Sequence, residues 1–293
     1  MPAIQAARID RPLAAHSRLS TARAIVELFH FPPILIVLLA CGIFASIAAD
    51  GSPPIGRIGV YLLAVLCSQM AIGVHNDYCD RALDSAAKPQ RAIPAGIVSP
   101  ALALQLTVAL LAMSVVLALP LGGDVLALGV LGTGMGFIYN AWAKGTIWAW
   151  APFWVALPTL AVASFTVVDA YRDELLLTYM IGLPLVVPVY VADTLTDIDS
   201  DRAHGVRSLA TRLGRFGSRF LCWSSLALGY VLAVAFWPQG GSPGLLFGVS
   251  IGLLAIAILS DRLSVPRVHW LAIMLADIAL AADWLLDVRS LSG

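Results

Sequence analysis

The chain has 293 residues, of which 59% are hydrophobic and 12% are charged, and its mean hydropathy is +0.86. So few charged side chains cannot cover a water-soluble domain, so the composition excludes an ordinary soluble protein and indicates an integral membrane protein. Basic and acidic residues balance to a formal net charge of zero, which gives no support for a nucleic-acid partner. The four cysteines show no CxxC spacing, so neither a disulfide nor a thiolate metal site is expected.

Residues 1–22 are polar and are predicted to form a cytosolic tail, and residues 23–293 are predicted to form one polytopic transmembrane domain. A full-length apolar segment follows the tail, so we expect no cleaved signal peptide. A helix that crosses a bilayer needs about 20 mostly apolar residues. Nine segments meet this requirement, at 24–49, 58–76, 101–119, 122–142, 148–168, 174–193, 219–237, 243–260 and 268–287. The predicted fold class is therefore an all-α membrane protein, with nine transmembrane helices in one bundle around a central cavity.

The basic residues predict the orientation of this bundle. Most lysines and arginines fall in the N-terminal tail or in loops on the same side, whereas only Arg57, Arg172 and Arg289 fall on the other side. Cytoplasmic loops carry the excess of Lys and Arg, so the N-terminus and the cap of the cavity are predicted to face the cytoplasm.

Two sets of oxygen-bearing side chains end the second and the sixth predicted spans, both on the cytoplasmic side. They are Asn76, Asp80 and Asp84 in the first set, and Asp193, Asp197 and Asp201 in the second. Each set steps by four residues, so on a helix its members share one face. Carboxylates at the edge of a membrane are costly and indicate function. Hard cations prefer oxygen ligands, so two such sets suit Mg²⁺ that carries a diphosphate.

Cations follow each set closely, Lys88 and Arg91 after the first and Arg207 after the second. Lysine and arginine neutralise phosphate oxygens, and together with Mg²⁺ they would stabilise a departing diphosphate. If that substrate is an allylic prenyl diphosphate, its departure leaves a carbocation that aromatic rings can steady. The candidate rings are Tyr139, Trp142, Trp148, Trp150 and Tyr190.

Each acidic segment taken alone leaves a second interpretation open, namely a solvated loop end. Two segments of matching spacing, on one side of the membrane and each followed by arginine, favour a shared site instead. Helix, acidic set and basic loop also recur four spans apart, which is a weak parallel repeat. Asp277 and Asp283 lie on different faces of the last predicted span, and the sequence alone assigns them no role.

Two stretches of the chain resemble the signature motifs of the UbiA superfamily of intramembrane prenyltransferases. The first combines Asn76, Asp80 and Asp84 with Lys88, Arg91 and Gly96, and the second combines Asp193, Asp197 and Asp201 with Gly205, Arg207 and Ser208. The resemblance covers nearly the whole chain, because that family also has nine helices. It implies Mg²⁺-dependent transfer of a prenyl group from a polyprenyl diphosphate to an aromatic or quinone-precursor acceptor, with a chlorin as an alternative.

The resemblance also assigns roles to individual residues. It implies metal ligation by Asn76, Asp80, Asp84, Asp193, Asp197 and Asp201, with Asp80, Asp84, Asp197 and Asp201 as catalytic groups. It implies substrate binding by Asn76, Lys88, Arg91, Tyr139, Lys144 and Arg207. The chain departs from the family at Ala92, where proline is usual, and at Gln69, where the 4-hydroxybenzoate branch often has arginine. The second departure weakens the case for a carboxylated aromatic acid as the acceptor.

Two other functions compete with this prediction. A membrane terpene cyclase would use the same diphosphate-ionising site, but the prenyl tail itself would capture the cation. A lipid or solute transporter would suit a parallel repeat, although a transport site should place its polar groups near the bilayer midplane. The predicted partners are a polyprenyl diphosphate, a prenyl acceptor and the lipid bilayer, and the sequence does not predict the oligomeric state.

Overall fold

The computed structural model describes residues 23–24, 26–195, 198–203 and 206–291, and the predicted tail at 1–22 lies outside that part of the chain. Every long element in the described part is helical. The helices are α2 (Phe31–Ala48), α3 (Ile55–Ala87), α4 (Pro100–Ala118), α5 (Gly123–Ile138), α6 (Ala151–Thr166), α7 (Leu177–Thr194), α8 (Ile198–Ala203), α9 (Leu209–Ala235), α10 (Leu245–Arg262) and α11 (Pro266–Ser290). Each predicted span overlaps one of them, and only the short helix α8 has no counterpart in the prediction.

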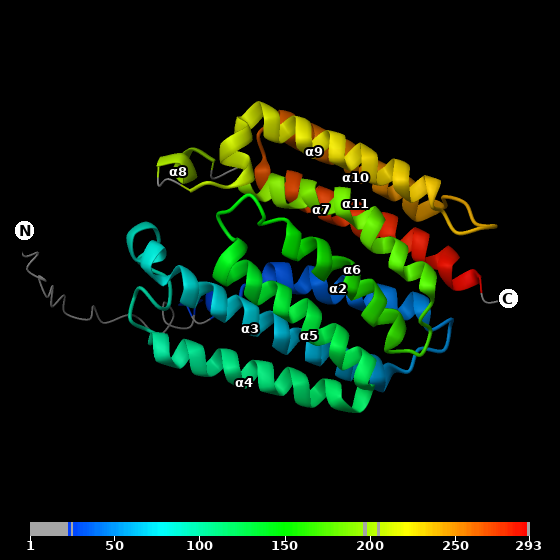
Figure 1. Cartoon of the computed structure of the whole chain (residues 1–293), viewed down its shortest axis with the longest axis horizontal. Helices are drawn as coiled ribbons and strands as arrows, with labels where there is room; N and C mark the ends of the chain where they lie inside the picture. The colour runs from blue at the N-terminus through cyan, green and yellow to red at the C-terminus, as the bar shows by residue number, and fades with distance from the viewer. Residues whose placement is uncertain (1–22, 25, 196–197, 204–205, 292–293) are drawn as a thin grey trace, which may run out of the picture.

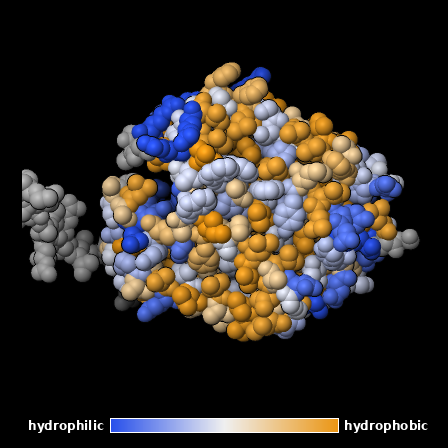
Figure 2. All heavy atoms as spheres, in the orientation of Figure 1, coloured by the Kyte–Doolittle hydropathy of each residue, from blue (hydrophilic) through white to orange (hydrophobic). Residues whose placement is uncertain are grey.

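Seven of the described helices are long and apolar enough to cross a membrane, and α6 is an apolar helix of shorter length. Figure 2 shows hydrophobic side chains over the middle of one face, with hydrophilic side chains gathered toward the two ends of the helices. A bilayer requires this distribution, since its hydrocarbon core excludes polar groups. The structure therefore indicates a multi-pass membrane protein, while nine crossings stay a prediction.

The helices lie roughly along one axis of the molecule (Figure 1). On one side α4 packs along α3, and on the other side α9 packs along α7 and α10 along α11. Helices α2 and α6 lie between these two groups and contact each other. The largest hydrophobic core is formed where α2, α6, α7, α9 and α11 meet, with Phe165, Leu280 and Leu285 almost completely buried.

The first predicted span, 24–49, starts too early. Helix α2 begins at Phe31, after His30 adopts the left-handed backbone conformation with φ of 54°. Pro32 and Pro33 therefore stand in the first helical turn instead of inside the span. Proline is favoured there because the first N–H groups of a helix have no intrahelical acceptor.

The second predicted span, 58–76, ends too early, because hydropathy falls before the helix ends. Helix α3 continues to Ala87, because polar side chains end an apolar stretch without ending the backbone hydrogen bonds. The backbone N–H of Lys88 closes the helix by donating to the carbonyl oxygen of Asp84 at 2.7 Å. The first acidic set therefore lies on one helix, as predicted.

The second acidic set is not on one helix. Asp193 belongs to α7, which ends at Thr194, whereas Asp201 belongs to the separate helix α8. Asp197 lies between them, outside the described residues. The condition for a shared face, that all three residues lie on one helix, is therefore not met by the assigned helices, since Asp193 and Asp201 belong to α7 and α8.

The weak repeat has a structural counterpart. The Ser99 hydroxyl accepts a hydrogen bond from the N–H of Leu102 at the start of α4, and the Ser208 hydroxyl accepts one from Thr211 at the start of α9. A serine at this position supplies an acceptor to the free N–H groups of the first turn. Each acidic set is thus followed by a basic loop and then by a serine-capped helix that packs back along the helix before the loop.

Candidate active site

Both acidic sets lie at the same end of the bundle. In Figure 1 the loop after α3 and the short helix α8 both project at the end opposite the C-terminus. The loop after α3 is anchored by the buried side chains of Ala92, Ile93 and Val98. The carbonyl oxygen of Ala92 accepts hydrogen bonds from the N–H groups of Ile97 and Val98, and Gly96 supplies the positive φ of 73° that this tight turn requires. The position where the family usually has proline is therefore part of a closed turn.

Lys144 lies directly against the first acidic set. Its Nζ is 2.8 Å from Asn76 Oδ1, and it also forms an ion pair with Asp80. Lys144 follows the π-helical turn η2 (Tyr139–Ala143), and its N–H donates to the Tyr139 carbonyl oxygen at 2.8 Å. This wide turn carries the lysine from the end of α5 across to α3. The structure thus brings together two groups of predicted site residues that are far apart in the sequence.

Asp84 and Arg91 form the next contact along the same face. Asp84 is only 4% exposed, and Arg91 Nη1 lies 3.4 Å from its Oδ2. Lys88 is more distant, with Nζ 3.9 Å from Asp84 Oδ1, and its side chain is 54% exposed. Arg91 is therefore held beside the carboxylates, while Lys88 is free to reach outward from the end of α3.

Asp77 is a residue that the sequence reasoning did not select. Its carboxylate is buried, with Oδ1 2.8 Å from His30 Nε2 and 2.5 Å from Arg91 Nη1. It links the start of α2, helix α3 and the loop that carries Arg91. The sequence could have identified Asp77, because it precedes Asp84 by about two helical turns and so lies on the same face of the helix.

The candidate aromatic rings divide into two groups. Tyr139 packs edge-on against Phe153, with ring centroids 4.8 Å apart, and Tyr190 is buried in α7. Trp142 and Trp148 are 63% and 51% exposed. Trp150, the fifth candidate, is half-buried and packs against the main hydrophobic core. The two tyrosines and Trp150 therefore lie against the interior of the bundle, whereas Trp142 and Trp148 are exposed.

The second acidic set is described in less detail. Asp193 is exposed near the end of α7, Arg207 is exposed just before α9, and the side chain of Asp201 lies outside what the structure describes. Helix α8 is fastened to α9 by two contacts. The Arg202 guanidinium donates to the Thr211 carbonyl oxygen, and Asp199 pairs with Arg215 at 2.6 Å.

The described donors suit a magnesium ion that a substrate helps to bind. Among the described residues, no three His, Cys, Asp or Glu side chains converge closely enough to form a complete metal site. Mg²⁺ is usually bound by one or two carboxylates together with waters and substrate phosphates, so a complete protein cage is not required. The Lys144 ammonium lies between oxygens of Asn76 and Asp80, which shows that these hard ligands can converge on a cation.

A model of the UbiA prenyltransferase family matches residues 34–280 of this chain. The chain belongs to the UbiA prenyltransferase family. It is therefore a prenyltransferase, as its signature motifs predicted. The 4-hydroxybenzoate octaprenyltransferase of Shewanella amazonensis is 28% identical over 229 residues, which cover 74% of this chain and 75% of the relative. The bacteriochlorophyll synthase 33 kDa chain of Cereibacter sphaeroides is 29% identical over 247 residues, covering 79% of this chain and 80% of the relative.

Solved structures of UbiA homologues share the fold. A homologue from Archaeoglobus fulgidus, bound to GPP and Mg²⁺, superposes with a TM-score of 0.64 at 13% identity, covering 90% of this chain and 99% of that chain. A digeranylgeranylglyceryl phosphate synthase superposes with a TM-score of 0.67 at 16% identity, covering 92% and 99%. At these identities the comparison shows that this chain has the same fold as those proteins, and it shows no more than the fold.

Proposed function

We propose that this UbiA-family enzyme transfers a prenyl group from a polyprenyl diphosphate to an aromatic or quinone-precursor acceptor, in a Mg²⁺-dependent reaction that releases diphosphate. The observation that carries the proposal is the cluster at the end of α3. There, Lys144 bridges Asn76 and Asp80, and Arg91 pairs with Asp84. Alternating cations and oxygens at one end of an apolar bundle suit an anionic headgroup with a lipid tail.

The cations of this cluster would bind the leaving diphosphate. Lys144 and Arg91 neutralise Asp80 and Asp84, and they would turn their donors toward phosphate oxygens when the substrate binds. Lys88 and Arg207, both exposed, would add charge from the outer side. Fixed cations stabilise charge that develops on a leaving group without further reorganisation, which makes departure faster.

The acidic residues would hold the headgroup through magnesium. Asn76, Asp80 and Asp84 would act from α3, and Asp193, Asp197 and Asp201 from the segment that joins α7 to α8. Mg²⁺, when bound, would withdraw negative charge from the phosphate oxygens that leave. The donor set of the first group fits this role because all of its ligand atoms are hard oxygens.

The apolar bundle would protect the reactive prenyl cation. Water would capture this cation, so the reaction requires a site that excludes water. The rings of Tyr139 and Tyr190, which face the interior, would steady the positive charge through their π-electrons until the acceptor attacks. The tail of the substrate would lie among the helices of the transmembrane unit 23–293, with the headgroup at the cytoplasmic end.

The acceptor is proposed from the relatives and from one residue. The relatives include 4-hydroxybenzoate octaprenyltransferases and a bacteriochlorophyll synthase chain. Gln69 stands in α3 and provides no positive charge for a carboxylated ring. We therefore favour a neutral aromatic or quinone-precursor acceptor, with a chlorin as the alternative.

The test measures diphosphate release by purified protein in nanodiscs. Geranyl, farnesyl, geranylgeranyl and octaprenyl diphosphates are supplied with Mg²⁺, each with and without a panel of aromatic, chlorin and glycerol-phosphate acceptors. Products are identified by mass spectrometry. Release that requires one acceptor supports the proposal and names the substrate. Acceptor-free release of a cyclic hydrocarbon would identify a terpene cyclase instead.

Matched variants connect this activity to the proposed site. Asp80→Asn should lower turnover by roughly 100-fold or more, because the Mg²⁺ that would stabilise the departing diphosphate loses a charged ligand. Asp124→Asn is the control, because Asp124 is an exposed aspartate in the first turn of α5, at the helix end away from Lys144. Equal turnover by the two variants would contradict the assignment of the first acidic set.

A further inference from the structure

The π-helical turn η2 carries Lys144 from α5 to the acidic set on α3. Single π-helical turns are rare and are frequently found at functional sites. In η2 the N–H of Lys144 donates to the Tyr139 carbonyl oxygen, five residues back. The lysine then reaches Asn76 and Asp80, which belong to a different helix. Its position therefore depends on how the turn is attached to α3.

Asn140, inside this turn, makes that attachment. The residue is buried, with 7% of its surface exposed, and its Nδ2 donates to the carbonyl oxygen of Ile72 at 2.9 Å. In an α-helix the Ile72 carbonyl oxygen also accepts from the N–H of Asn76, four residues later. The π-helical turn and the first member of the acidic set are therefore bound to the same carbonyl group.

Helices α5 and α3 approach each other closely at this point. A Cβ on Gly136, four residues before Asn140, would lie only 2.5 Å from Ile72 Cδ1. Phe137 packs against His75, with ring centroids 4.6 Å apart, and Asn140 Nδ2 is 3.4 Å from His75 Nδ1. The missing side chain of the glycine permits this approach. The approach in turn brings Asn140 within hydrogen-bond distance of α3.

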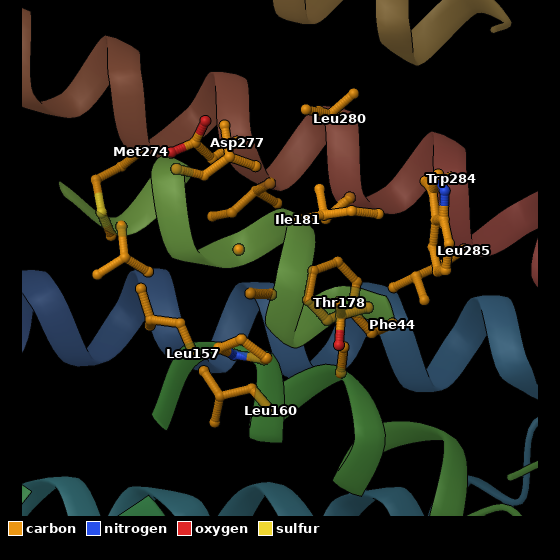
Figure 3. A pocket seen from close by; sticks show the side chains of 18 of the residues that line it. Phe44, Leu157, Leu160, Thr178, Ile181, Met274, Asp277, Leu280, Trp284 and Leu285 are labelled. Carbon is orange, nitrogen blue, oxygen red and sulfur yellow. The ribbon is translucent and has the colours of Figure 1, made fainter. Parts of the chain in front are cut away.

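Asn140 is separate from the apolar cavity in the middle of the bundle. That cavity has a volume of about 140 Å³ and lies between α2, α6, α7 and α11, where Phe44, Leu157 and Trp284 line it (Figure 3). Neither Asn140 nor Lys144 is among the described residues that line the cavity. Replacing Asn140 therefore leaves the cavity walls intact, and its effect on activity has to pass through the turn.

We infer that Asn140 is a positioning residue, which fixes the π-helical turn to α3 and so holds the Lys144 ammonium against Asn76 and Asp80. The catalytic consequence of this contact rests on the proposed function, but the contact itself does not. Without it the turn would move, and misplacement of a group by about 1 Å can slow a reaction by about 100-fold. Asn140 acts through Lys144 and does not itself bind the diphosphate.

The first test measures how fast Lys144 reacts with an amine reagent. The chain has two lysines, so Lys88 is an internal reference for Lys144 in the same sample. Protein in phosphatidylcholine nanodiscs is labelled briefly with acetic anhydride, without Mg²⁺ or prenyl diphosphate, and the labelled peptides are quantified by mass spectrometry. An ammonium paired with a carboxylate reacts slowly, because only the free amine attacks the reagent. No catalysis is required, so an inactive enzyme would not affect this result.

Asn140→Leu removes the donor and nearly keeps the size of the side chain, and Ser114→Ala is the matched control. Ser114 Oγ also donates to a carbonyl oxygen of α3, that of Ala64 at 2.8 Å, about three helical turns before the acidic set. We expect the labelling ratio of Lys144 to Lys88 to rise about three- to tenfold in Asn140→Leu, as the loss of one hydrogen bond allows. The ratio should stay unchanged in Ser114→Ala, and equal ratios in the two variants would overturn the inference.

The second test asks whether Asn140 acts through Lys144. Turnover is measured for the wild type, Asn140→Leu, Lys144→Met and the double variant. Asn140→Leu should lower turnover about three- to tenfold in the wild type but less than about twofold in Lys144→Met, because no ammonium is left to position. Equal losses in both backgrounds would show a purely structural role and would overturn the inference. Absence of turnover in the wild type would contradict the proposed function, while the lysine ratio would still decide the positioning.

A second variant covers the case in which Asn140→Leu does not fold. In Gly136→Ala the added Cβ would push α5 away from Ile72 and leave the asparagine in place. The labelling ratio of the two lysines should again rise above that of Ser114→Ala. An unchanged ratio in Gly136→Ala would then overturn the inference.

Discussion

The buried pair Asp77–Arg91 should be one of the strongest ionic contacts in the protein. Arg91 Nη1 lies 2.5 Å from Asp77 Oδ1, and the two side chains are 25% and 5% exposed. Hydrogen bonds to charged groups contribute about 1.5–3 kcal/mol when solvent screening is weak. Arg91 keeps some solvent contact and a second partner in Asp84, so a double-mutant cycle with Asp77→Asn and Arg91→Gln should give a coupling near the lower end, about 1.5 kcal/mol.

The assay is unfolding by SDS in mixed micelles, followed through tryptophan fluorescence, for the wild type, both single variants and the double variant. The pair Asp199–Arg215 provides a control of the same chemistry, since its atoms are 2.6 Å apart but its side chains are 73% and 57% exposed. Exposed ion pairs contribute between zero and about 1 kcal/mol. A cycle on this second pair should therefore give clearly less coupling.

The reasoning depends on burial, because the two pairs have almost the same length. If both cycles give the same coupling energy, burial does not strengthen the Asp77–Arg91 contact and the argument is wrong. The Asp77→Asn variant also tests function, since loss of the Asp77 carboxylate leaves Arg91 held on α3 only by its longer contact with Asp84. The KM for the prenyl diphosphate should then rise more than kcat falls, because Arg91 remains present but is no longer oriented.

Other contacts predict further outcomes. Lys144→Met should lower kcat by roughly 10- to 100-fold and should also lower the Mg²⁺ concentration for half-maximal activity, because the ammonium competes with the metal for Asp80; an unchanged Mg²⁺ dependence would contradict this competition. Gly229→Ala should destabilise the fold by about 1–3 kcal/mol, since a Cβ there would overlap the Leu185 side chain, whereas Gly248→Ala, with open space around it, should be neutral or stabilising when both are measured by SDS unfolding. Asp283→Ala should cost about 1–2 kcal/mol in the same assay, because the first N–H groups of α10 would lose their acceptor; no measurable loss would contradict its capping role.

The sequence predicted the helices better than their ends. Hydropathy over about 20 residues identifies a membrane helix, and each predicted segment coincides with a helix of the structure. The ends failed where hydropathy and helix formation differ. Helix α3 continues through its polar residues to Ala87, and α2 begins only at Phe31, where prolines occupy the first turn. The division of this segment into α7 and α8 was not predicted, because a four-residue spacing of aspartates is the same with or without a helix boundary.

The sequence predicted part of the geometry of the candidate site. The spacing of Asn76, Asp80 and Asp84 indicated a shared face, because three or four residues make one helical turn and this relation is local. The resemblance to the UbiA motifs selected Lys144, but its contact with Asp80 depends on the width of the π-helical turn before it. Asp77 was passed over, since its partner His30 directly precedes α2 and the sequence does not show how the start of α2 lies against α3.

The sequence by itself determined that this is a helical membrane protein with two acidic sets at one side, because composition, hydropathy and spacing are properties of neighbouring residues. Only the tertiary structure decided which charged side chains form ion pairs and which buried polar groups have hydrogen-bond partners. Asp283 and Asp277 lie on the same helix and are the same residue type, yet one caps α10 and the other lines an apolar cavity. Their difference comes from the helices packed against each face of α11. Local sequence patterns predict helices but not which distant segments pack against them.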